Sequence, residues 1–460
     1  MTQKGGTGES VFANGHASGH SGNCHGVRAL LTGMAADLEN GLVPLRIYND
    51  PDVYRDELVR VFGRNWVFVA HESEIPTPGD YVARSIGEDP FIVARGEDSV
   101  VRVLFNSCRH RGTQICAADK GNSSHFRCPY HGWTYNNAGD LVGIPNRKQA
   151  YPGLEPSEWG LLPAPQVDSY RGLIFACLDT DTPPLLDHLG DYRWYLDIHL
   201  GLAPGGMEVV GDPHRWLIDA DWKSGAENFA GDSYHTQSLH RSIPEIGLTS
   251  KAVAGASGGA NDIHVTECSG HSTSIRRLDA DQSPFWTYPP EVRELFQDNG
   301  LSAEQIDLAR RSVVHTGTIF PNLSLIHLGG TDDAAKPPAA YLSFRQWQPR
   351  GPGQMEAWSW VLVPKGSPEA YKRRAHKVAV ATFSPSGNFE QDDSVVWGRA
   401  ARPARGVFAT KAGVRLNYQM GLEHMSLAHV LDDWPGPGVV YNSNLEEGVQ
   451  RTFFRSWIRE

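Results

Sequence analysis

The chain contains Cys108-Arg109-His110-Arg111-Gly112 and, further on, Cys128-Pro129-Tyr130-His131-Gly132-Trp133. Each stretch offers one thiolate and one imidazole and ends in a glycine turn. Two thiolates on one iron and two neutral imidazoles on the other hold a [2Fe–2S] cluster whose reduction potential lies above that of an all-cysteine cluster. The same four side chains could close a tetrahedral zinc site, which is the alternative. The pattern predicts a metal centre held by Cys108, His110, Cys128 and His131 and favours a one-electron carrier.

The residues around these ligands favour the cluster over zinc. The complete string, from Cys108 to Gly112 and from Cys128 to Trp133, resembles the Rieske signature of bacterial aromatic-ring-hydroxylating dioxygenases. The resemblance implies two similar loops that clamp the cluster from either side. We therefore expect a Rieske [2Fe–2S] centre.

Length and composition indicate an ordinary globular protein with more than one core. The 460 residues are 40% hydrophobic and 21% charged, which is enough for two domains. The Gly-, Ser- and His-rich start, residues 1–26, lacks a secretory signal and is expected to be disordered. No apolar run is long enough to span a membrane, so we expect the cytoplasm. The other cysteines, which are scattered rather than spaced for disulfides, are expected to be buried thiols: Cys24, Cys116, Cys177 and Cys268.

The charge balance argues against a nucleic-acid partner. The formal net charge is −11, from 42 basic and 53 acidic residues, whereas a phosphate backbone calls for a concentrated basic face. One basic run stands out, at residues 372–377. We interpret it as a solvated helix face, and a docking patch for an acidic electron donor is the alternative.

Local patterns predict several helices and strands. Asp50 as N-cap and Pro51 at the first helical position predict a helix that ends at Gly63, with Val53, Tyr54, Leu58, Val61 and Phe62 buried. Short β-rich runs predict strands at 81–83, 91–94, 100–105 and 172–176. Later in the chain, 347–354 and 356–363 predict a hairpin around a Pro-Gly-rich turn, and 368–382 predicts a helix.

A second group of metal-ligating side chains follows, with His235 and His240 five residues apart and Asp232 before them. A non-haem Fe(II) oxygenase needs two imidazoles and one carboxylate on one face of the metal. On an ideal helix an interval of five rotates the side chains about 140° apart, so we predict an irregular helix such as a π-bulge. The alternative is a pair of surface histidines. A cluster that delivers single electrons favours the iron site, because oxygen activation at iron consumes them.

The stretch from Asn228 to His240 resembles the mononuclear-iron motif of naphthalene-dioxygenase-like oxygenase α subunits, a family that includes biphenyl and phthalate dioxygenases, here of the actinobacterial type. The resemblance implies that Asp393 is the third iron ligand, although the residues alone do not choose between Asp392 and Asp393. It implies that Asn228 and Asp232 assist catalysis and that Asp232 bridges His235 to a cluster histidine, His131, of a neighbouring subunit. Because this bridge crosses subunits, the resemblance implies a trimeric ring. An isolated monomer is then expected to be nearly inactive.

The resemblance also divides the chain and predicts an α+β fold. Residues 1–42 are expected to be a flexible N-terminal tail and lead-in, and 43–64 a helix that belongs to the catalytic domain. Residues 65–184 are expected to form a small all-β Rieske domain. Residues 185–460 are expected to form the catalytic mononuclear-iron domain, with an antiparallel β-sheet flanked by helices.

The substrate pocket is expected to be an apolar slot for a flat ring. Cations nearby, Arg276 and Arg277 together with Arg241 and Lys251, suggest that the substrate is an aromatic carboxylate of the phthalate type, since guanidinium forks match carboxylates. Arginines on a solvated loop are the alternative. By the same resemblance the pocket positions are Asn228, Phe229, Thr236, Thr316, Ile326, Phe383 and Phe389.

The function that this resemblance implies is that of an oxygenase component in aromatic hydrocarbon catabolism. It would add both atoms of dioxygen to an aromatic ring and give a cis-dihydrodiol, with electrons from NAD(P)H through a ferredoxin or reductase. A small β subunit in an α3β3 hexamer is expected. The alternatives are a polycyclic or biphenyl-type hydrocarbon dioxygenase, a Rieske monooxygenase or demethylase, and a plain electron carrier without mononuclear iron.

Overall fold

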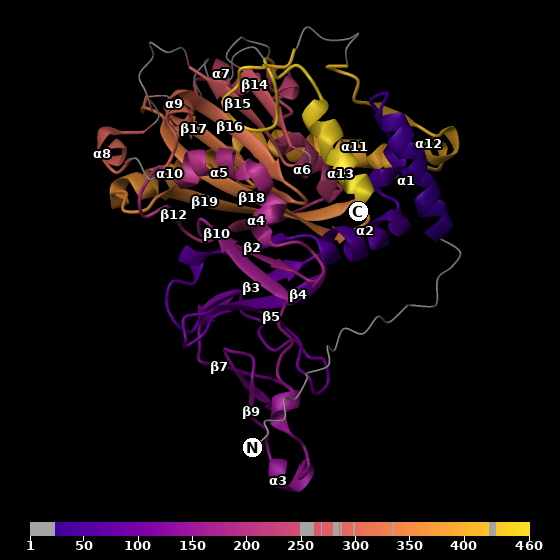
Figure 1. The fold of residues 1–460 in the computed structure, drawn as a ribbon, viewed down its shortest axis with the longest axis vertical. Coiled ribbons are helices and arrows are strands. Elements are labelled where there is room, and N and C mark those ends of the chain that lie inside the picture. Colours follow the sequence, from indigo (N-terminus) through magenta and orange to yellow (C-terminus); the bar gives the residue numbers. More distant parts are fainter. Residues whose placement is uncertain are drawn as a thin grey trace, which may run out of the picture.

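The computed structural model describes residues 24–248, 262–267, 269–278, 285, 288–297, 300–333, 335–422 and 429–460. The expectation of disorder for the first 23 residues lies outside this part of the chain, as do Lys251 and Cys268. Figure 1 shows a broad upper lobe that holds the large sheet and most helices, and a narrow lower lobe of short strands. The fold is α+β, as predicted.

The N-terminal segment differs from the predicted flexible lead-in, because residues 24–38 form helix α1 (Cys24–Leu38). Val27, Met34 and Leu38 are buried along one stripe of this helix, which packs beside α2 (Pro51–Arg64) and α13 (Gly448–Arg459). Packing against these helices stabilises a segment whose few apolar residues are a weak signal in a Gly-rich sequence. Strand β1 (Leu42–Pro44) and a 3₁₀ turn lead from α1 to α2.

Helix α2 begins where predicted. The Asp50 carboxylate accepts hydrogen bonds from the backbone N–H groups of Asp52 (2.8 Å) and Val53 (3.4 Å). The helix continues through Gly63 to Arg64, one residue beyond the predicted end. Glu57, which the pattern did not mark as buried, is 3% exposed and accepts hydrogen bonds from Lys223 Nζ (2.5 Å) and from Trp222 Nε1 (3.0 Å). Helix α2 is thereby tied to helix α6 (Trp222–Phe229) of the upper lobe.

The lower lobe is built from three small antiparallel sheets. The strands predicted at 81–83, 91–94 and 100–105 are β3, β4 and β5, and the strand predicted at 172–176 is β11. The sheet orders are β5-β4-β3-β6, β7-β8-β9 and β10-β11-β2. Their bounds are β2 (Val67–His71), β3 (Asp80–Ile86), β4 (Asp89–Arg95), β5 (Val101–Phe105), β6 (Lys120–Asn122), β7 (His125–Arg127), β8 (Thr134–Asn136), β9 (Leu141–Gly143), β10 (Gln166–Tyr170) and β11 (Leu173–Cys177).

The upper lobe is organised by one antiparallel sheet of nine described strands, in the order β12-β19-β18-β17-β16-β15-β14-β21, with β13 also paired to β19. The predicted hairpin is β18 and β19, but its turn falls at Pro352 and Gly353, so Gln354 opens the second strand rather than ending the first. The bounds are β12 (Met207–Val209), β13 (His214–Ile218), β14 (Asp262–Thr266), β15 (Ser272–Arg277), β16 (Ser312–Ile319), β17 (Leu323–Gly330), β18 (Ala339–Gly351), β19 (Gln354–Pro364) and β21 (Val439–Tyr441).

Helices cover both faces of this sheet. On one face lie α6 (Trp222–Phe229), α10 (Glu369–Phe383), α11 (Asn388–Ala404) and α13, and their core includes Phe229, Trp347 and Phe383. On the other face lie α5 (Arg193–Leu200), α9 (Ala303–Arg311) and strand β2.

Among the described residues no helix is long and apolar enough to cross a membrane. The shorter elements are α3 (Arg147–Ala150), α4 (Leu185–Leu189), α7 (Ser242–Glu245), α8 (Pro290–Arg293), α12 (Val407–Ala412) and β20 (Arg415–Asn417).

Two sequence predictions about surface and core are resolved by side-chain contacts. Cys116 and Cys177 are buried free thiols, as predicted.

The basic run at 372–377 lies on α10, where Lys372 pairs with Glu208 (3.1 Å) and Lys377 pairs with Asp332 (2.9 Å). These acidic partners neutralise much of the patch, which favours a solvated helix face over a docking site for an acidic protein.

Buried histidines form two clusters, one of which includes His315 of β16 and His327 of β17. His199 Nε2 lies 2.7 Å from His315 Nδ1, and the His199 ring stacks on His327 at 4.4 Å between centroids. In the second cluster His271 Nδ1 accepts a hydrogen bond from the Phe320 N–H (3.0 Å), while His271 Nε2 donates to the His188 carbonyl (2.8 Å). Burial, aided by the neighbouring rings, lowers the pKa of His315 to about 3 and of His188 to about 3. Burial alone lowers the pKa of His327 to about 4.

These histidines should make the fold sensitive to acid. Because their pKa is lower in the folded protein than in the unfolded chain, the unfolded chain binds protons that the folded protein does not. Their contribution is therefore complete above the unfolded pKa of about 6.5 and is lost below it, by about 1.4 kcal/mol per histidine per pH unit. Near-UV circular dichroism should show a lower melting temperature at pH 5.5 than at pH 7.5. His315→Gln with His327→Gln should flatten this dependence, and equal wild-type melting temperatures would contradict it.

Candidate metal centres and aromatic pocket

The two ligand loops of the lower lobe have the same backbone geometry. In the first, the Gly112 N–H donates to the Cys108 carbonyl (2.8 Å), and in the second the Gly132 N–H donates to the Cys128 carbonyl (3.0 Å). Gly112 and Gly132 have φ of +75° and +71°, a conformation that favours glycine. The cysteine N–H groups are also bound within their own loops, by the carbonyls of Thr113 and Trp133. The turns thereby direct one cysteine and one histidine of each loop toward a common centre.

The side chains between these loops fit an iron–sulfur cluster. Cys108 and Cys128 are each 3% exposed, and burial, together with the adjacent Cys128 thiol, raises the pKa of the Cys108 thiol. His110 Nδ1 is buried without a hydrogen-bond partner, while its Nε2 lies 3.2 Å from the Tyr151 hydroxyl. Two inward thiols and an inward nitrogen that lacks a partner are what a bound cluster would satisfy. His131 is exposed, so one imidazole of the site faces solvent.

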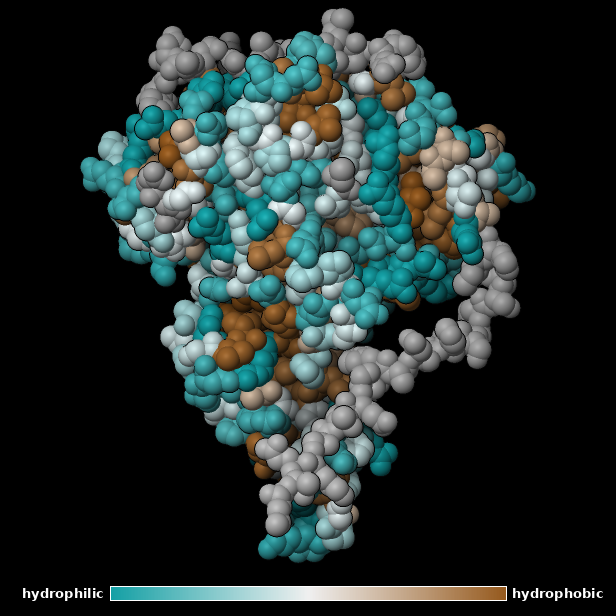
Figure 2. Space-filling model, viewed as in Figure 1, coloured by the Kyte–Doolittle hydropathy of each residue, from teal (hydrophilic) through white to brown (hydrophobic). Residues whose placement is uncertain are grey.

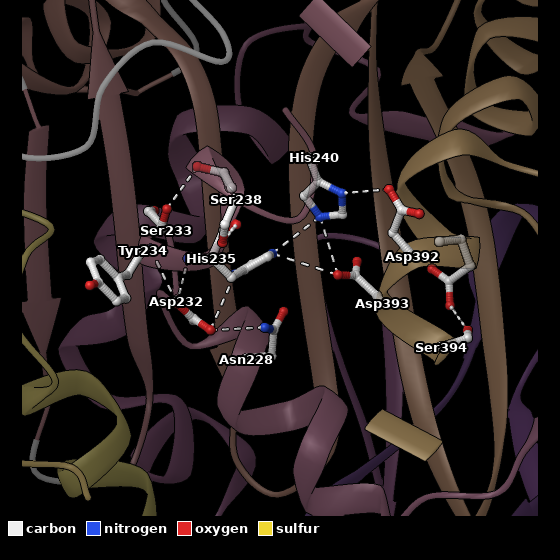
Figure 3. A network of polar contacts seen from close by, with 12 residues as sticks. Asn228, Asp232, Ser233, Tyr234, His235, Ser238, His240, Asp392, Asp393 and Ser394 are labelled. Atoms are coloured by element: carbon white, nitrogen blue, oxygen red, sulfur yellow. Dashed lines mark hydrogen bonds and ion pairs between the residues drawn. The ribbon is translucent and has the colours of Figure 1, made fainter. Parts of the chain in front are cut away.

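The second site lies between α6 and α11 in the upper lobe (Figure 3). His235 Nε2 is 3.2 Å from His240 Nε2, and Asp393 Oδ1 is 3.6 Å from His235 Nε2 and 3.2 Å from His240 Nε2. Ring nitrogens that present lone pairs to each other and to a carboxylate repel one another unless a proton or a metal ion lies between them. Two imidazoles and one carboxylate form the ligand set of non-haem Fe(II) oxygenases. The arrangement therefore suits a divalent metal such as ferrous iron.

The backbone of this site is not the π-bulge that the spacing predicted. Helix α6 ends at Phe229, Gly231 follows in a turn with a φ of +156°, and His235 lies on a 3₁₀ helix (Tyr234–Gln237). The 3₁₀ helix ends at Gln237, and His240 follows it outside any helix or strand. The prediction of an irregular path was right, but the helix is interrupted rather than widened, because Gly231 and Asp232 end the α-helical hydrogen bonding before the first histidine.

Asp232 orients the first histidine. Its Oδ2 is 3.2 Å from His235 Nδ1, and its Oδ1 accepts from the backbone N–H of Tyr234 (3.1 Å). Asn228 Nδ2 donates to Asp232 Oδ2 at 3.2 Å (Figure 3). Although burial lowers the pKa of His235, Asp232 and Asp393 together outweigh it and raise that pKa to about 9. With the Asp232 carboxylate beside Nδ1, Nε2 is the nitrogen that faces the centre.

The structure distinguishes the two candidate carboxylates of α11. Asp393 is buried and points toward both histidines, whereas the side chain of Asp392 is 39% exposed and its Oδ2 lies 3.5 Å from His240 Nδ1. Asp392 thus lies beside Nδ1 of His240, as Asp232 lies beside Nδ1 of His235. Sequence reasoning treated Asp392 only as a rival ligand or a solvated acid. Its contact with His240 depends on the pitch of α11, which the acidic run alone did not reveal.

Aromatic side chains line the metal site. Phe389 lies against His240 with ring centroids 4.9 Å apart and stacks on Phe383 at 5.1 Å, and Phe383 meets Phe229 edge-on at 6.1 Å. Ile326 is buried in the same core and pairs with Thr316 across β16 and β17. The three aromatic residues predicted for the pocket therefore pack together, and one of them, Phe389, touches a proposed iron ligand. The Thr236 hydroxyl donates to the Ser233 carbonyl within its own turn.

The cations that suggested a carboxylate substrate have other partners. Arg276 Nε donates to the Asp262 carboxylate at 2.9 Å, and the Arg277 guanidinium lies 5.2 Å from the ring centroid of Trp434. Arg241 pairs with Glu245 and is largely exposed. The hypothesis of a phthalate-type substrate therefore loses the guanidinium anchors on which it depended.

Comparison with known families and proteins is consistent with both sites. The family described as "Rieske [2Fe-2S] domain" matches residues 65–170, and the family described as "Ring hydroxylating alpha subunit (catalytic domain)" matches residues 186–413. The chain is 39% identical over 432 residues to the N,N-dimethyl phenylurea N-demethylase subunit alpha of Sphingobium sp. (strain YBL2), covering 92% of each protein. It is 35% identical over 446 residues to the biphenyl dioxygenase subunit alpha of Paraburkholderia xenovorans (strain LB400), covering 92% of this chain and 91% of that protein.

Among solved structures, naphthalene 1,2-dioxygenase from Rhodococcus sp., bound to indole, is similar to this chain with a TM-score of 0.89 and 43% identity. The match covers 94% of this chain and 98% of that chain. At this level of identity and coverage the similarity extends through both lobes and both candidate metal centres.

The choice between Asp392 and Asp393 can be tested by metal content. Asp393→Asn should lose about one iron per chain and keep the visible spectrum of the two-iron cluster, because a neutral amide is a poor replacement for an anionic ligand. Asp392→Asn is the matched control, one residue away on the same helix. It should keep the iron, with its affinity for Fe(II) reduced by about tenfold at most, as expected for a group that contacts a ligand rather than the metal. Loss of iron from Asp392→Asn but not from Asp393→Asn would reverse the assignment.

Proposed function

We propose an activity for this chain from the premise that it belongs to the α subunits of the Rieske ring-hydroxylating dioxygenases, with a [2Fe–2S] cluster and a mononuclear iron as cofactors. The proposed reaction adds both atoms of dioxygen to an uncharged aromatic ring and gives a cis-dihydrodiol. One observation carries this proposal: the convergence of His235, His240 and Asp393 directly beside stacked aromatic side chains.

The residues of this chain have separate tasks in that reaction. Cys108, His110, Cys128 and His131 would hold the cluster, and His235, His240 and Asp393 would hold the mononuclear iron. Activation of dioxygen is chemistry that this iron supplies when it is bound, with electrons delivered one at a time from the cluster.

The protein itself orients the ligands and shields the reacting ring. Asp232 lies 3.2 Å from His235 Nδ1 and would hold a proton there, which keeps Nε2 available at the centre, while Asn228 donates to Asp232 and holds its carboxylate in place. Phe389 lies against His240 and packs on Phe383, which in turn meets Phe229, so the three rings would form one apolar wall against which a flat substrate can lie. These walls exclude water from the ring that reacts.

The composition of this pocket favours a hydrocarbon over an aromatic acid. Phe229, Phe383 and Phe389 make one wall of it apolar, and a carboxylate buried there would need a cationic partner to offset its lost hydration. The cation nearest to these rings, Arg345, is already paired with Glu390. Arg276 is engaged by Asp262, which makes it unsuited to that role. The relatives named for biphenyl and naphthalene act on uncharged rings, and we propose a substrate of that class.

N-demethylation of an aryl amine is the second candidate function. It is favoured by one specific observation, the similarity to a protein named N,N-dimethyl phenylurea N-demethylase subunit alpha. Such a reaction would use the same two metal centres but would leave one oxygen atom in water rather than placing both in the product. The two candidates therefore differ in a directly measurable way.

We also propose that electrons pass between neighbouring chains. Within one chain the cluster loops lie in the narrow lower lobe, whereas α6 and α11 lie in the upper lobe (Figure 1). His131 and its neighbour Tyr130 are exposed, and Tyr130 is 64% exposed despite its large ring. Hydrophobic residues also reach the surface of the lower lobe (Figure 2), as expected of a surface that another subunit covers. In a head-to-tail ring His131 would lie beside Asp232 of the next chain.

The assembly and its electron supply complete the proposal. The relatives are named α subunits, which implies a further subunit, and we propose an α3β3 hexamer. A ferredoxin or reductase would carry electrons from NAD(P)H to the cluster, and we place the reaction in the cytoplasm, where that cofactor is regenerated.

Oxygen labelling separates the candidate functions. With an electron-donor system, ¹⁸O₂ and a panel of naphthalene, biphenyl, phthalate and a dimethylated phenylurea, we expect a cis-dihydrodiol with both oxygen atoms labelled from one of the hydrocarbons. Phthalate should be a poor substrate. Formaldehyde and a monomethyl product, without any diol, would instead establish the demethylase. His235→Ala should abolish turnover and leave the cluster spectrum intact, which controls for the integrity of the protein.

A further inference from the structure

A buried arginine lies beneath the aromatic walls of the iron site. Arg345 is on β18, in register between Ser324 of β17 and Ser359 of β19, and its side chain is completely buried. Strand alternation points it to the sheet face that carries α6, α10 and α11, the same face as Trp347. A fully buried guanidinium is costly and needs partners that offset its lost hydration.

One partner of Arg345 belongs to the helix that carries Asp393. Arg345 Nη2 lies 2.5 Å from Glu390 Oε2, and both side chains are at most 1% exposed. Glu390 and Asp393 are three residues apart in the first turns of α11, so their side chains lie on neighbouring parts of one helix face. The ion pair therefore joins the central sheet to the helix at a point one turn from the proposed iron ligand.

The other partners of Arg345 are aromatic rings. Its guanidinium carbon lies 4.9 Å from the ring centroid of Phe229 and 5.4 Å from that of Phe383, with Trp347 and Trp216 at 4.8 Å and 5.5 Å. None of the three guanidinium nitrogens has a hydrogen-bond partner among the described residues, so the ion pair through Nη2 and these π faces are what offset the buried charge. Phe229 and Phe383 are the same residues that wall the proposed substrate pocket.

We propose that Arg345 is a positioning residue of this oxygenase, which fixes the first turn of α11 through Glu390 and thereby sets Asp393 and the two phenylalanine walls relative to His235 and His240. It touches neither substrate nor metal. The inference rests on the proposed iron site, and it deepens that proposal by naming the group that fixes the carboxylate and the aromatic walls together.

The charge of Arg345 makes the proposal distinguishable from a simple electrostatic effect. Removing a cation close to the site should by itself strengthen binding of Fe(II), because one positive charge that repels the metal is gone. Loss of positioning should instead weaken it, since the ligand helix is no longer fixed by its ion pair. The two effects therefore change the affinity in opposite directions.

The experiment measures Fe(II) binding to protein whose mononuclear site has been emptied and whose cluster is retained. Arg345→Met should bind Fe(II) at least about tenfold more weakly than the wild type, and the visible spectrum of the cluster should be unchanged. The ratio of diol isomers from biphenyl or naphthalene should also shift, because the phenylalanine walls lose their common support. Arg345→Lys keeps the charge but lacks the planar fork, so it should show the same changes to a smaller degree and serves if Arg345→Met does not fold.

Arg84→Met is the matched control. Arg84 forms the same kind of buried pair, with Glu74 at 2.5 Å, and stacks over Trp358 at 5.0 Å, but it lies on β3 of the lower lobe. This variant should keep wild-type Fe(II) affinity and the wild-type product ratio. Unchanged affinity in Arg345→Met and Arg345→Lys, or tighter binding in Arg345→Met, would overturn the positioning role. Failure of the wild type itself to bind Fe(II) would overturn the proposed iron site instead.

Discussion

The contact between Asp232 and His235 is the interaction on which the rest of the catalytic arrangement depends. An imidazole can ligate a metal through only one nitrogen at a time, and the carboxylate 3.2 Å from Nδ1 leaves Nε2 for the centre. The same carboxylate is held by Asn228 and by the backbone of the turn that carries His235. The ligand, its orienting group and the residue that holds that group therefore come from one short segment, and any shift of α6 moves all three.

Buried ion pairs fix this segment relative to the other ligand. Glu57 and Lys223 tie the start of α6 to α2, and Arg345 and Glu390 tie the start of α11 to the sheet. Pairs that are almost wholly buried add little net stability, but they are specific, because breaking one leaves an uncompensated charge in the core. The two helices that must place ligands within a few ångströms of each other are thus each held near their start by a buried ion pair.

The sequence allowed the two metal centres to be predicted, because their ligands lie in short motifs whose chemistry is local: Cys108 and His110, Cys128 and His131, His235 and His240. The residues alone did not choose between Asp392 and Asp393, because the pitch and burial of α11 determine which carboxylate faces the histidines. The choice of Asp393 came from a resemblance. The π-bulge was a wrong inference from spacing on an ideal helix. The ion pair of Arg345 with Glu390 was beyond sequence reasoning, because it depends on the register of β18 and on how α11 crosses it. Helix α1 was missed because its apolar stripe is sparse and is stabilised by helices distant in sequence.

The central claim is that the cluster of one chain supplies the iron of its neighbour, and two inactive variants test it most directly when they are assembled together. Cys128→Ser removes the cluster and His235→Ala removes the mononuclear iron, so neither variant has a complete path within one chain. If electrons cross between chains of a closed ring, co-assembled variants should regain about a quarter of the wild-type rate, since about one junction in four pairs an intact cluster with an intact iron. No recovered activity in a mixed assembly of confirmed composition would contradict the account.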